Sequence, residues 1–394
     1  MIEGVDAHRF RALGFLALAE LLAMGLWFGV SAVAPQIVAE WGLRSAAPLT
    51  LAVQAGFVAG TLLSAISNLP DIVRARHLFV VSALLGAGAN AAFALFAHSL
   101  STAVALRFLT GVCLAGVYPP GMKIVATWFR AGRGFALGVL IGALTLGKAS
   151  PYLVNVLGSS NWRFNVALAS LLAAAGAAIV ALFVGEGPFA LPNQRFDITQ
   201  IVKVFANRGV RLANFGYFGH MWELYAMWTW VPVMLRASMA KSGHTTSLAD
   251  AGAFAVIGAG AIGCVIAGIV ADRIGRAVVA SAAMAVSGAC CLLIGPLFGG
   301  SPWPLLIVAT IWGASVVADS AQFSACVTEL GDPRYLGTAL TMQTCIGFLI
   351  TTVSIALVPR LAAGIGWQWA FVSLAPGPIL GIIAMMRLGR TDGR

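Results

Sequence analysis

Residues 20–27 read ELLAMGLW, and residues 223–230 read ELYAMWTW. Glutamate, leucine, alanine, methionine and tryptophan recur at the same places of two long apolar stretches, 203 positions apart. A carboxylate inside a stretch of membrane length is costly, so such acids normally face an interior and serve a function. The same acid found twice in one frame predicts a duplicated membrane protein whose halves each bring an acid to a shared interior.

The rest of the chain supports a duplication with this offset. Three further landmarks recur at nearly the same spacing: an aspartate after the second apolar segment of each half, a glycine at the start of a fifth, and a tryptophan before a sixth. They are Asp71 and Asp272, 201 positions apart, Gly134 and Gly337, 203 apart, and Trp162 and Trp367, 205 apart. A period of half the chain argues for two homologous bundles and against a short-period solenoid.

Composition places the chain in a bilayer. Of its 394 residues 60% are apolar, 10% are charged and 45 are glycine, which is more hydrophobic surface than a soluble core can use. Only helices satisfy their backbone across about 30 Å of hydrocarbon, and each crossing takes roughly 20 residues. Twelve crossings are expected, at 11–33, 48–69, 78–97, 101–126, 134–157, 163–185, 210–235, 249–271, 277–299, 303–328, 337–359 and 367–388. The predicted fold is an all-α membrane protein, with six-helix bundles at 1–185 and 210–394 and a linker at 186–209.

Basic residues predict the orientation, because cytoplasmic loops retain lysine and arginine. With the N-terminus inside, sixteen basic residues fall in inner loops and ends, and five fall in outer loops. Both termini and the linker are therefore expected in the cytoplasm. Inner loops that face anionic lipid explain the net charge of +10 without a nucleic-acid partner. An amphipathic piece at 198–205 predicts a short helix within the linker.

Several motifs resemble the major facilitator superfamily. Residues 268–276, GIVADRIGR, resemble its G-x-x-x-D-R-x-G-R loop signature, and residues 69–76, LPDIVRAR, look like a degraded copy. Residues 107–111, RFLTG, are similar to its R-x-x-x-G motif, and Trp162 and Trp367 resemble the residues that open its sixth and twelfth helices. The resemblance covers the whole chain. It implies a bacterial inner-membrane transporter of the twelve-helix type, with a site walled by the first, fourth, seventh and tenth helices.

The loop motifs carry charges whose expected role is gating. A short glycine-containing turn with one aspartate and two arginines can bridge helix ends, because a carboxylate is favoured at a helix N-terminus and a guanidinium at a C-terminus. Such contacts can break and reform as the halves rock. The gating residues expected from the two loops are Asp71, Arg74, Arg76, Asp272, Arg273, Gly275 and Arg276.

Three acids lie near the middle of predicted spans. Glu20, Glu223 and Asp319 are each about nine to twelve residues from a span end, hence roughly 14–18 Å deep at 1.5 Å per residue. A carboxylate there is paired, hydrated, or protonated as proton coupling requires; the alternative is an acid locked to a partner on another helix. We expect substrate binding or proton coupling at all three, because intramembrane ionisable groups are functional by default.

Glu223 has the richest surroundings and is the leading candidate for coupling. His220 lies three positions before it, where a helix places both on one face, and Tyr225 and Trp228 add amphipathic rings. His220 is either a proton relay or a hydrogen-bond partner of the acid. In the first half, Trp27 is the aromatic member of the repeat that also contains Glu20.

Other spans offer polar partners for these acids. Asp319 and Gln322 share a face of the tenth span by the same spacing. Lys148 lies deep in the fifth span, where it is either the partner of a carboxylate or the anchor of an anionic substrate group. Arg107 occupies a superfamily motif position in the fourth span, which favours a conformational or proton-linked role.

The repeat also makes predictions about geometry. A pseudo-two-fold axis along the membrane normal maps the first helix of each half onto the other, so Glu20 and Glu223 are expected to face one another across a central cavity. Two carboxylates in one pocket disfavour double ionisation and would titrate jointly. Tyr118, Pro119 and Pro120 are expected to bend the fourth helix. The glycines at 134, 138 and 142 allow close helix approach.

The sequence shows no signature of an enzyme, a cofactor or a metal. It has no phosphate-binding loop, nucleophile elbow or His-Glu metal helix, and its six cysteines fall inside predicted spans without paired spacing. The first hypothesis is a proton-coupled secondary transporter that works by alternating access; the second is a transporter-like receptor or assembly factor that binds without transport. The expected partners are a small-molecule substrate, protons and the lipid bilayer, and the chain is expected to be a monomer. Organic anions, zwitterions and cations all stay open as substrates.

Overall fold

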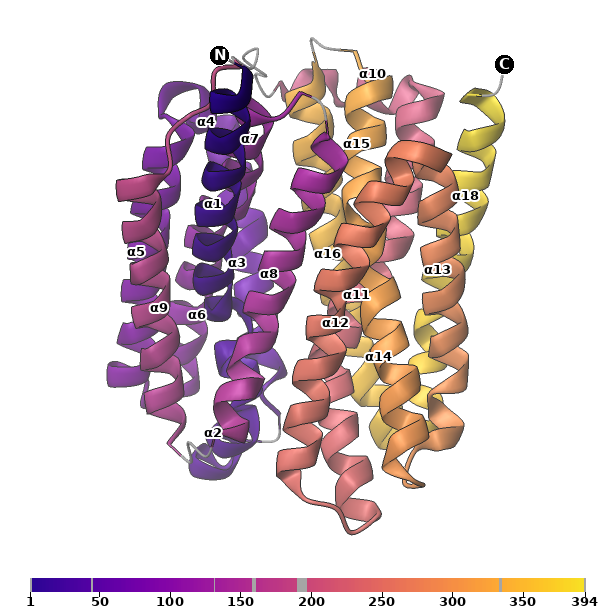
Figure 1. Cartoon of the computed structure of the whole chain (residues 1–394). Helices are drawn as coiled ribbons and strands as arrows, with labels where there is room; N and C mark the ends of the chain where they lie inside the picture. Colours follow the sequence, from indigo (N-terminus) through magenta and orange to yellow (C-terminus); the bar gives the residue numbers. More distant parts are fainter. Residues whose placement is uncertain are drawn as a thin grey trace.

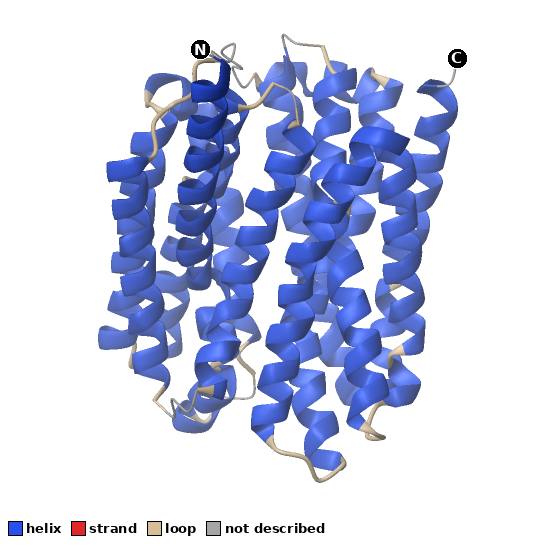
Figure 2. Cartoon of the chain, viewed as in Figure 1, coloured by secondary structure: helices blue, strands red, loops and turns tan. Residues whose placement is uncertain are grey.

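The computed structural model describes residues 2–43, 45–130, 132–157, 161–189, 197–332 and 335–392, with side chains described for the same ranges except 2–7, 70, 71, 198, 391 and 392. Within these ranges the secondary structure is helical and contains no strand (Figure 2). Two bundles stand side by side, and the termini lie at the same end of the molecule (Figure 1). We call this end the termini side and the other end the opposite side.

Over its described residues, the first bundle, indigo to magenta in Figure 1, contains nine helices. They are α1 (Ile2–Ala32), α2 (Ala34–Trp41), α3 (Ala47–Ile66), α4 (Leu69–Ile72), α5 (Ala75–Phe96), α6 (Leu100–Leu114), α7 (Tyr118–Trp128), α8 (Arg133–Val156) and α9 (Trp162–Phe183). A 3-10 turn at Ile198–Gln200 and α10 (Ile201–Ala206) follow, which confirms the short helix expected in the linker.

The second bundle runs from salmon to yellow in Figure 1. Its elements are α11 (Arg208–Lys241), α12 (Thr246–Ile274), α13 (Arg276–Leu293), a 3-10 turn at Gly295–Leu297, α14 (Pro302–Ala318), α15 (Ser320–Leu330), α16 (Leu336–Ile365), α17 (Trp367–Ala370), a 3-10 turn at Phe371–Leu374 and α18 (Pro376–Asp392).

Eleven stretches of the described chain are long and apolar enough to cross a membrane. Each coincides with one of the twelve predicted spans. The remaining span is α11, which at 34 residues reaches about 51 Å at 1.5 Å per residue. Its sequence is rich in tryptophan, tyrosine and glycine and holds Glu223, so it lacks the hydropathy of the other spans. It does not need that hydropathy, because most of its residues are buried among neighbouring helices.

The fourth and tenth spans are interrupted at equivalent depths. The fourth breaks between α6 and α7 at residues 115–117, just before Tyr118, Pro119 and Pro120, which confirms the expected bend. The tenth breaks between α14 and α15 at Asp319, 203 positions after residue 116. The second break was not predicted, because no proline marks it. Interrupted helices at matching places of two repeats mark the binding region in many transporters.

The two bundles meet most closely where α8 runs along α12. A Cβ atom added to Gly134, Gly138 or Gly142 would lie within 3.0 Å of α12 backbone oxygens, those of Gly268, Cys264 and Ala261. The predicted close approach is therefore confirmed: glycine lets the two backbones touch. We call this contact the α8–α12 seam.

A polar cluster fastens α2 to the start of α9 on the opposite side. The indole N–H of Trp162 donates to Glu40 Oε2 at 2.6 Å, and Arg163 Nη1 lies 2.9 Å from Glu40 Oε1. The Trp162 hydrogen bond, aided by Arg163, holds the pKa of Glu40 below its ordinary value. Trp162, recognised in the sequence as a landmark, thus anchors the start of the sixth span.

Candidate functional site

Lys148 of α8 ends in a cage built by both bundles. Its Nζ donates to the hydroxyl oxygen of Tyr225 on α11 at 2.7 Å. The same nitrogen lies 4.3 Å from the ring centroid of Trp27 on α1, 4.6 Å from that of Tyr225 and 4.7 Å from that of Trp228. These distances are those of cation–π contacts. Lys148, Trp27 and Trp228 are each 1% exposed, so the site is sealed from solvent in this conformation.

More aromatic rings close over the cage. The ring centroids of Phe57 on α3 and Phe348 on α16 lie 4.4 Å apart, and the Phe348 centroid lies 5.0 Å from that of Tyr225 and 5.7 Å from that of Trp27. Phe28 packs on Trp228 at 6.1 Å. We call Trp27, Phe28, Phe57, Tyr225, Trp228 and Phe348 the central aromatic cluster. Its members come from two helices of each bundle, so any separation of the bundles must take the cluster apart.

Local packing places Lys148 and Trp27 beside each other. A Cβ atom on Gly147 would lie 2.2 Å from the carbonyl oxygen of Leu21, so α8 can touch α1 only because this residue is glycine. From the other side, the buried Arg107 of α6 donates to the carbonyl oxygens of Leu26 at 2.9 Å and Trp27 at 2.6 Å. Arg107, predicted as a site residue, therefore lies behind the cage and positions Trp27.

Glu20 is buried without a hydrogen-bond partner among the described residues. It is 0% exposed, and neither carboxylate oxygen receives a donor there. The charge that acts on it is that of Lys148, yet the described atoms of the two side chains form no ion pair within 4.0 Å. On its other side, a Cβ atom at Gly121 of α7 would lie 3.0 Å from Glu20 Oε2. Glu20 and Lys148 are thus a buried acid and a buried amine that are held apart.

Glu223 is fully engaged within its own bundle. Its Oε2 accepts from Ser287 at 2.9 Å, and its Oε1 accepts from Trp312 at 2.5 Å and from the thiol of Cys291 at 3.2 Å. These donors lie on α13 and α14. The prediction that Glu20 and Glu223 face each other is therefore wrong in this conformation. Each acid points to the third and fourth spans of its own half, because the repeat conserves the internal packing of a bundle.

His220 pairs with Asp319 rather than with Glu223. Its Nδ1 lies 2.8 Å from Asp319 Oδ1, and its Nε2 lies 2.9 Å from the hydroxyl of Ser320. Both contacts lie at the break between α14 and α15, where His220 and Asp319 are each 1% exposed. The spacing of His220 and Glu223 correctly predicts that they share a helix face. It does not predict that Asp319, on a neighbouring helix, is the partner of His220.

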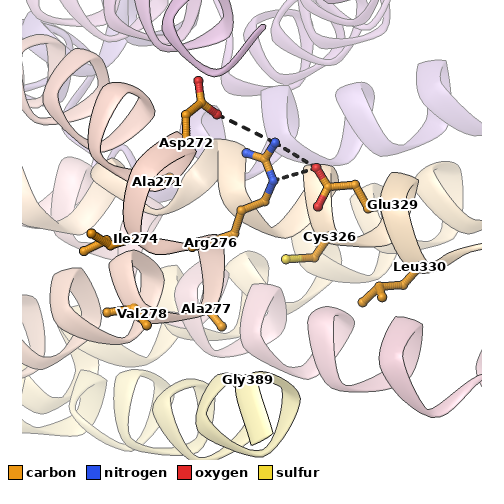
Figure 3. A pocket seen from close by; sticks show the side chains of 11 residues that line it. Ala271, Asp272, Ile274, Arg276, Ala277, Val278, Cys326, Glu329, Leu330 and Gly389 are labelled. Atoms are coloured by element: carbon orange, nitrogen blue, oxygen red, sulfur yellow. Dashed lines mark hydrogen bonds and ion pairs between the residues drawn. The ribbon is translucent and has the colours of Figure 1, made fainter. Parts of the chain in front are cut away.

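Gln322 does not join a site with Asp319. Its Oε1 accepts from Arg276 Nη1 at 3.2 Å, which directs it to the termini side. Arg276 also binds Glu329 of α15, with Nε and Nη2 both 2.8 Å from Oε1, and lies 3.9 Å from Asp272 (Figure 3). These charges border a cavity of about 490 Å³ between α12, α13, α15 and α18. Glu329 is not among the predicted site residues, although an acid near the end of the tenth span is a natural partner for a loop arginine.

Asp272 also reaches across to the other bundle. A Cβ atom on Gly134 would lie 2.6 Å and 2.7 Å from its carboxylate oxygens, so the acid lies against the N-terminus of α8. A negative charge is stabilised there by the helix dipole. Gly275 has a φ of +95°, which permits the tight turn before Arg276. Arg273 is exposed. The expected bridging of helix ends is thus observed for Asp272.

The corresponding loop of the first bundle, residues 69–76, is described except for two side chains. Arg76 donates to the carbonyl oxygen of Ala181 on α9, and Arg74 is exposed. The side chain of Asp71 lies outside the described residues.

On the opposite side the bundles touch again, because Arg236 of α11 donates to the carbonyl oxygen of Ala32 on α1 at 2.9 Å while it binds Asp250.

Comparison with known proteins agrees with this architecture. The family model described as Major Facilitator Superfamily matches residues 16–340. One relative, from Cupriavidus necator and named "Probable sulfoacetate transporter", is 25% identical over 198 residues, which cover 45% of this chain and 45% of that protein. Another, named "Agnestins efflux protein" and from Paecilomyces divaricatus, is 25% identical over 279 residues, 67% of this chain and 59% of that protein. The matches thus span about half the length of these relatives. Because the family model covers most of the sequence, the chain belongs to the Major Facilitator Superfamily.

Proposed function

We propose that the chain is a secondary active transporter that moves a small solute by alternating access and couples the movement to protons. The observation that carries this proposal is the cage around Lys148, which α8 and α1 of one bundle share with α11 of the other. A site divided between two bundles opens to a different side when the bundles rock, so binding and exposure are linked.

The conformation can be described by three of the contacts that the described residues make between the bundles. The α8–α12 seam lies toward the termini side, the central aromatic cluster lies at mid-height, and Arg236 meets Ala32 toward the opposite side. Alternating access requires the seam to separate in one state and the Arg236 contact to separate in the other. We propose that the termini side is cytoplasmic, as the basic loops indicate.

Glu20 supplies the proposed coupling to protons. A buried carboxylate without hydrogen-bond donors is most stable when it is neutral, unless a charge beside it compensates. The charge that can do so is that of Lys148 in the cage. Any event that engages Lys148 elsewhere favours proton uptake by Glu20. Glu223 accepts hydrogen bonds from three donors, so its carboxylate does not depend on a neighbouring charge. Its role in this proposal is structural.

The names of the two relatives, a transporter and an efflux protein, agree on transport and differ in the molecule moved. They therefore support the class of function for this chain and leave its substrate to experiment. A receptor that binds without transport is the alternative class.

Flux through purified protein in liposomes tests the proposal. We expect that one of a panel of small solutes, applied outside, changes the internal pH reported by trapped pyranine, because the protein carries solute and protons together. The panel contains acetate, glycolate, benzoate and methanesulfonate, the dianion malonate, the cations choline and tetramethylammonium, and neutral glycerol. Protein-free liposomes are the control for passive entry of weak acids. A solute that binds, as shown by a raised melting temperature, but never crosses would favour the receptor class.

A further inference from the structure

From the donors around Lys148 we infer the substrate class: the structure assigns the cage to a small organic molecule with a single oxyanion group, carried together with one proton. This inference rests on the proposed function, because it specifies what the same site binds. It goes further in fixing the charge of the cargo and the charge moved in each cycle.

The first argument is a surplus of hydrogen-bond donors. An ammonium has three N–H donors, and that of Lys148 is used once, by the hydroxyl of Tyr225. The indole nitrogens of Trp27 and Trp228, whose rings flank the ammonium, are buried and have no acceptor among the described residues. Buried donors without acceptors are costly. The complementary ligand is therefore rich in acceptors, as a carboxylate or sulfonate is.

The second argument concerns charge. The Lys148 amine is buried, and the acid that acts on it, Glu20, is too far away to form an ion pair with it. Attraction between opposite charges grows as their separation falls, so an oxyanion in direct contact with Nζ would be held more strongly than Glu20 is. The rest of the ligand would meet Phe28, Phe57 and Phe348, which suit a small apolar body.

The third argument is charge balance in a sealed site. Without substrate, Lys148 and Glu20 together carry no net charge. An entering monoanion adds one negative charge, and a proton taken from the same aqueous phase onto a Glu20 oxygen restores neutrality. When the anion is released on the other side, Lys148 again balances the charge of Glu20 alone. Glu20 therefore gives up its proton on that side. A dianion would leave one uncompensated negative charge in low dielectric, so it should be a poor cargo.

Few other groups can change this balance. Within the described part of the chain, the titratable side chains that interact electrostatically with Glu20 are Lys148 of α8 and Tyr118 of α7. From α5, the ring of Phe79 lies beside it, and α9 packs Gly176 against the preceding residue, Ala19. Asp319 is held by His220 in the other bundle. One anion and one proton per cycle is therefore the expected ratio.

Binding of the panel to variants of the purified protein tests the substrate class. At least one of acetate, glycolate, benzoate and methanesulfonate should raise the melting temperature of the unmodified protein, whereas choline and tetramethylammonium should not. Lys148→Met should weaken that binding by about 10- to 100-fold, as expected for loss of a hydrogen bond to a charged group. Lys123→Met, which removes a lysine of α7 outside the cage, is the matched control and should bind as the unmodified protein does.

A second variant guards against misfolding of Lys148→Met. Trp228→Phe keeps the aromatic face and removes the indole N–H, so it should weaken anion binding by about 3- to 10-fold. Binding of choline or tetramethylammonium in place of the anions would overturn the assignment, because the cage would then be a cation site. The assignment would also be overturned if no monoanion bound the unmodified protein, or if Lys148→Met bound the monoanion as tightly as the unmodified protein does.

The charge balance is tested by flux under a fixed membrane potential. Monoanion-driven acidification inside liposomes should be the same with inward-negative and inward-positive potassium diffusion potentials set by valinomycin, because the cycle moves no net charge. A rate that follows the potential would overturn the one-to-one ratio. Flux of neutral or cationic solutes alone would sink the anion class while leaving the transporter function intact. Lys148-dependent anion binding without any flux would support the class and refute the transport.

Discussion

Glu20→Gln is expected to abolish proton-driven accumulation of the transported solute while leaving the protein folded. The amide keeps the size of the side chain but cannot exchange a proton. With one proton per monoanion, a gradient of one pH unit sustains about tenfold accumulation in the unmodified protein, and the variant should show none. Downhill exchange of labelled for unlabelled solute should persist, because exchange requires only that the loaded site reorient. Paired measurements of accumulation and exchange in liposomes check this.

Glu223→Gln is the matched control, since it makes the same change at the equivalent place of the repeat. Its side chain accepts from Ser287, Cys291 and Trp312, and an amide cannot accept from all of them at both positions. We expect this variant to lose stability, by about 1–3 kcal/mol, yet to keep its ratio of protons to solute. The opposite pattern, with coupling lost in Glu223→Gln and kept in Glu20→Gln, would return the coupling role to the acid that the sequence favours.

Thr145→Cys is expected to place a thiol where oxidation stops transport completely. Thr145 of α8 contacts α12, since a Cβ atom on Gly260 would lie 2.8 Å from its methyl group, and the thiol of Cys264 on α12 lies beside its hydroxyl. A disulfide between positions 145 and 264 would join the bundles across the α8–α12 seam. If the seam must separate in each cycle, flux should fall to that of protein-free liposomes and recover after reduction.

Thr145→Ser separates this effect from damage by the oxidant. It keeps the hydroxyl and adds no thiol, so oxidised and reduced samples should transport equally. Cys264 and the five other cysteines are buried and form no disulfide with one another, which provides a low background. A cross-linked Thr145→Cys protein that transports at the uncross-linked rate would show that the seam stays closed throughout the cycle and would contradict rocking of the bundles.

Much of the fold was predictable because it follows from local chemistry. Each described crossing coincides with a predicted span, since length and hydropathy fix where a chain enters and leaves a bilayer. The bend at Tyr118 was predicted because Pro119 and Pro120 cannot continue a helix unchanged. The break at Asp319 was missed because it has no such local cause, although the repeat would have pointed to it from residue 116.

The candidate site was predictable as a set of residues but not as a set of contacts. Lys148, Glu20, Trp27, Tyr225 and Trp228 could be singled out because polar and aromatic groups stand out in apolar spans. Their pairing depends on how each helix is rotated about its axis. Spans that are apolar on all faces give no stripe from which that rotation can be read. His220 was therefore assigned to the wrong acid, and Gln322 and Arg107 were placed in a site that they border or support.

The composition of α11 has a consequence for how the protein is made. A translocon releases a helix into lipid according to its hydrophobicity, and tryptophan-, tyrosine- and glycine-rich segments with a central acid are released poorly on their own. The residues that build the cage, Tyr225 and Trp228, are part of that composition. This segment therefore depends on helices synthesised after it, such as α16 and α18 that pack on it, to complete its integration. Assembly of the second bundle is thus a late and collective step of biosynthesis, and the ligand cage exists only once that step is finished.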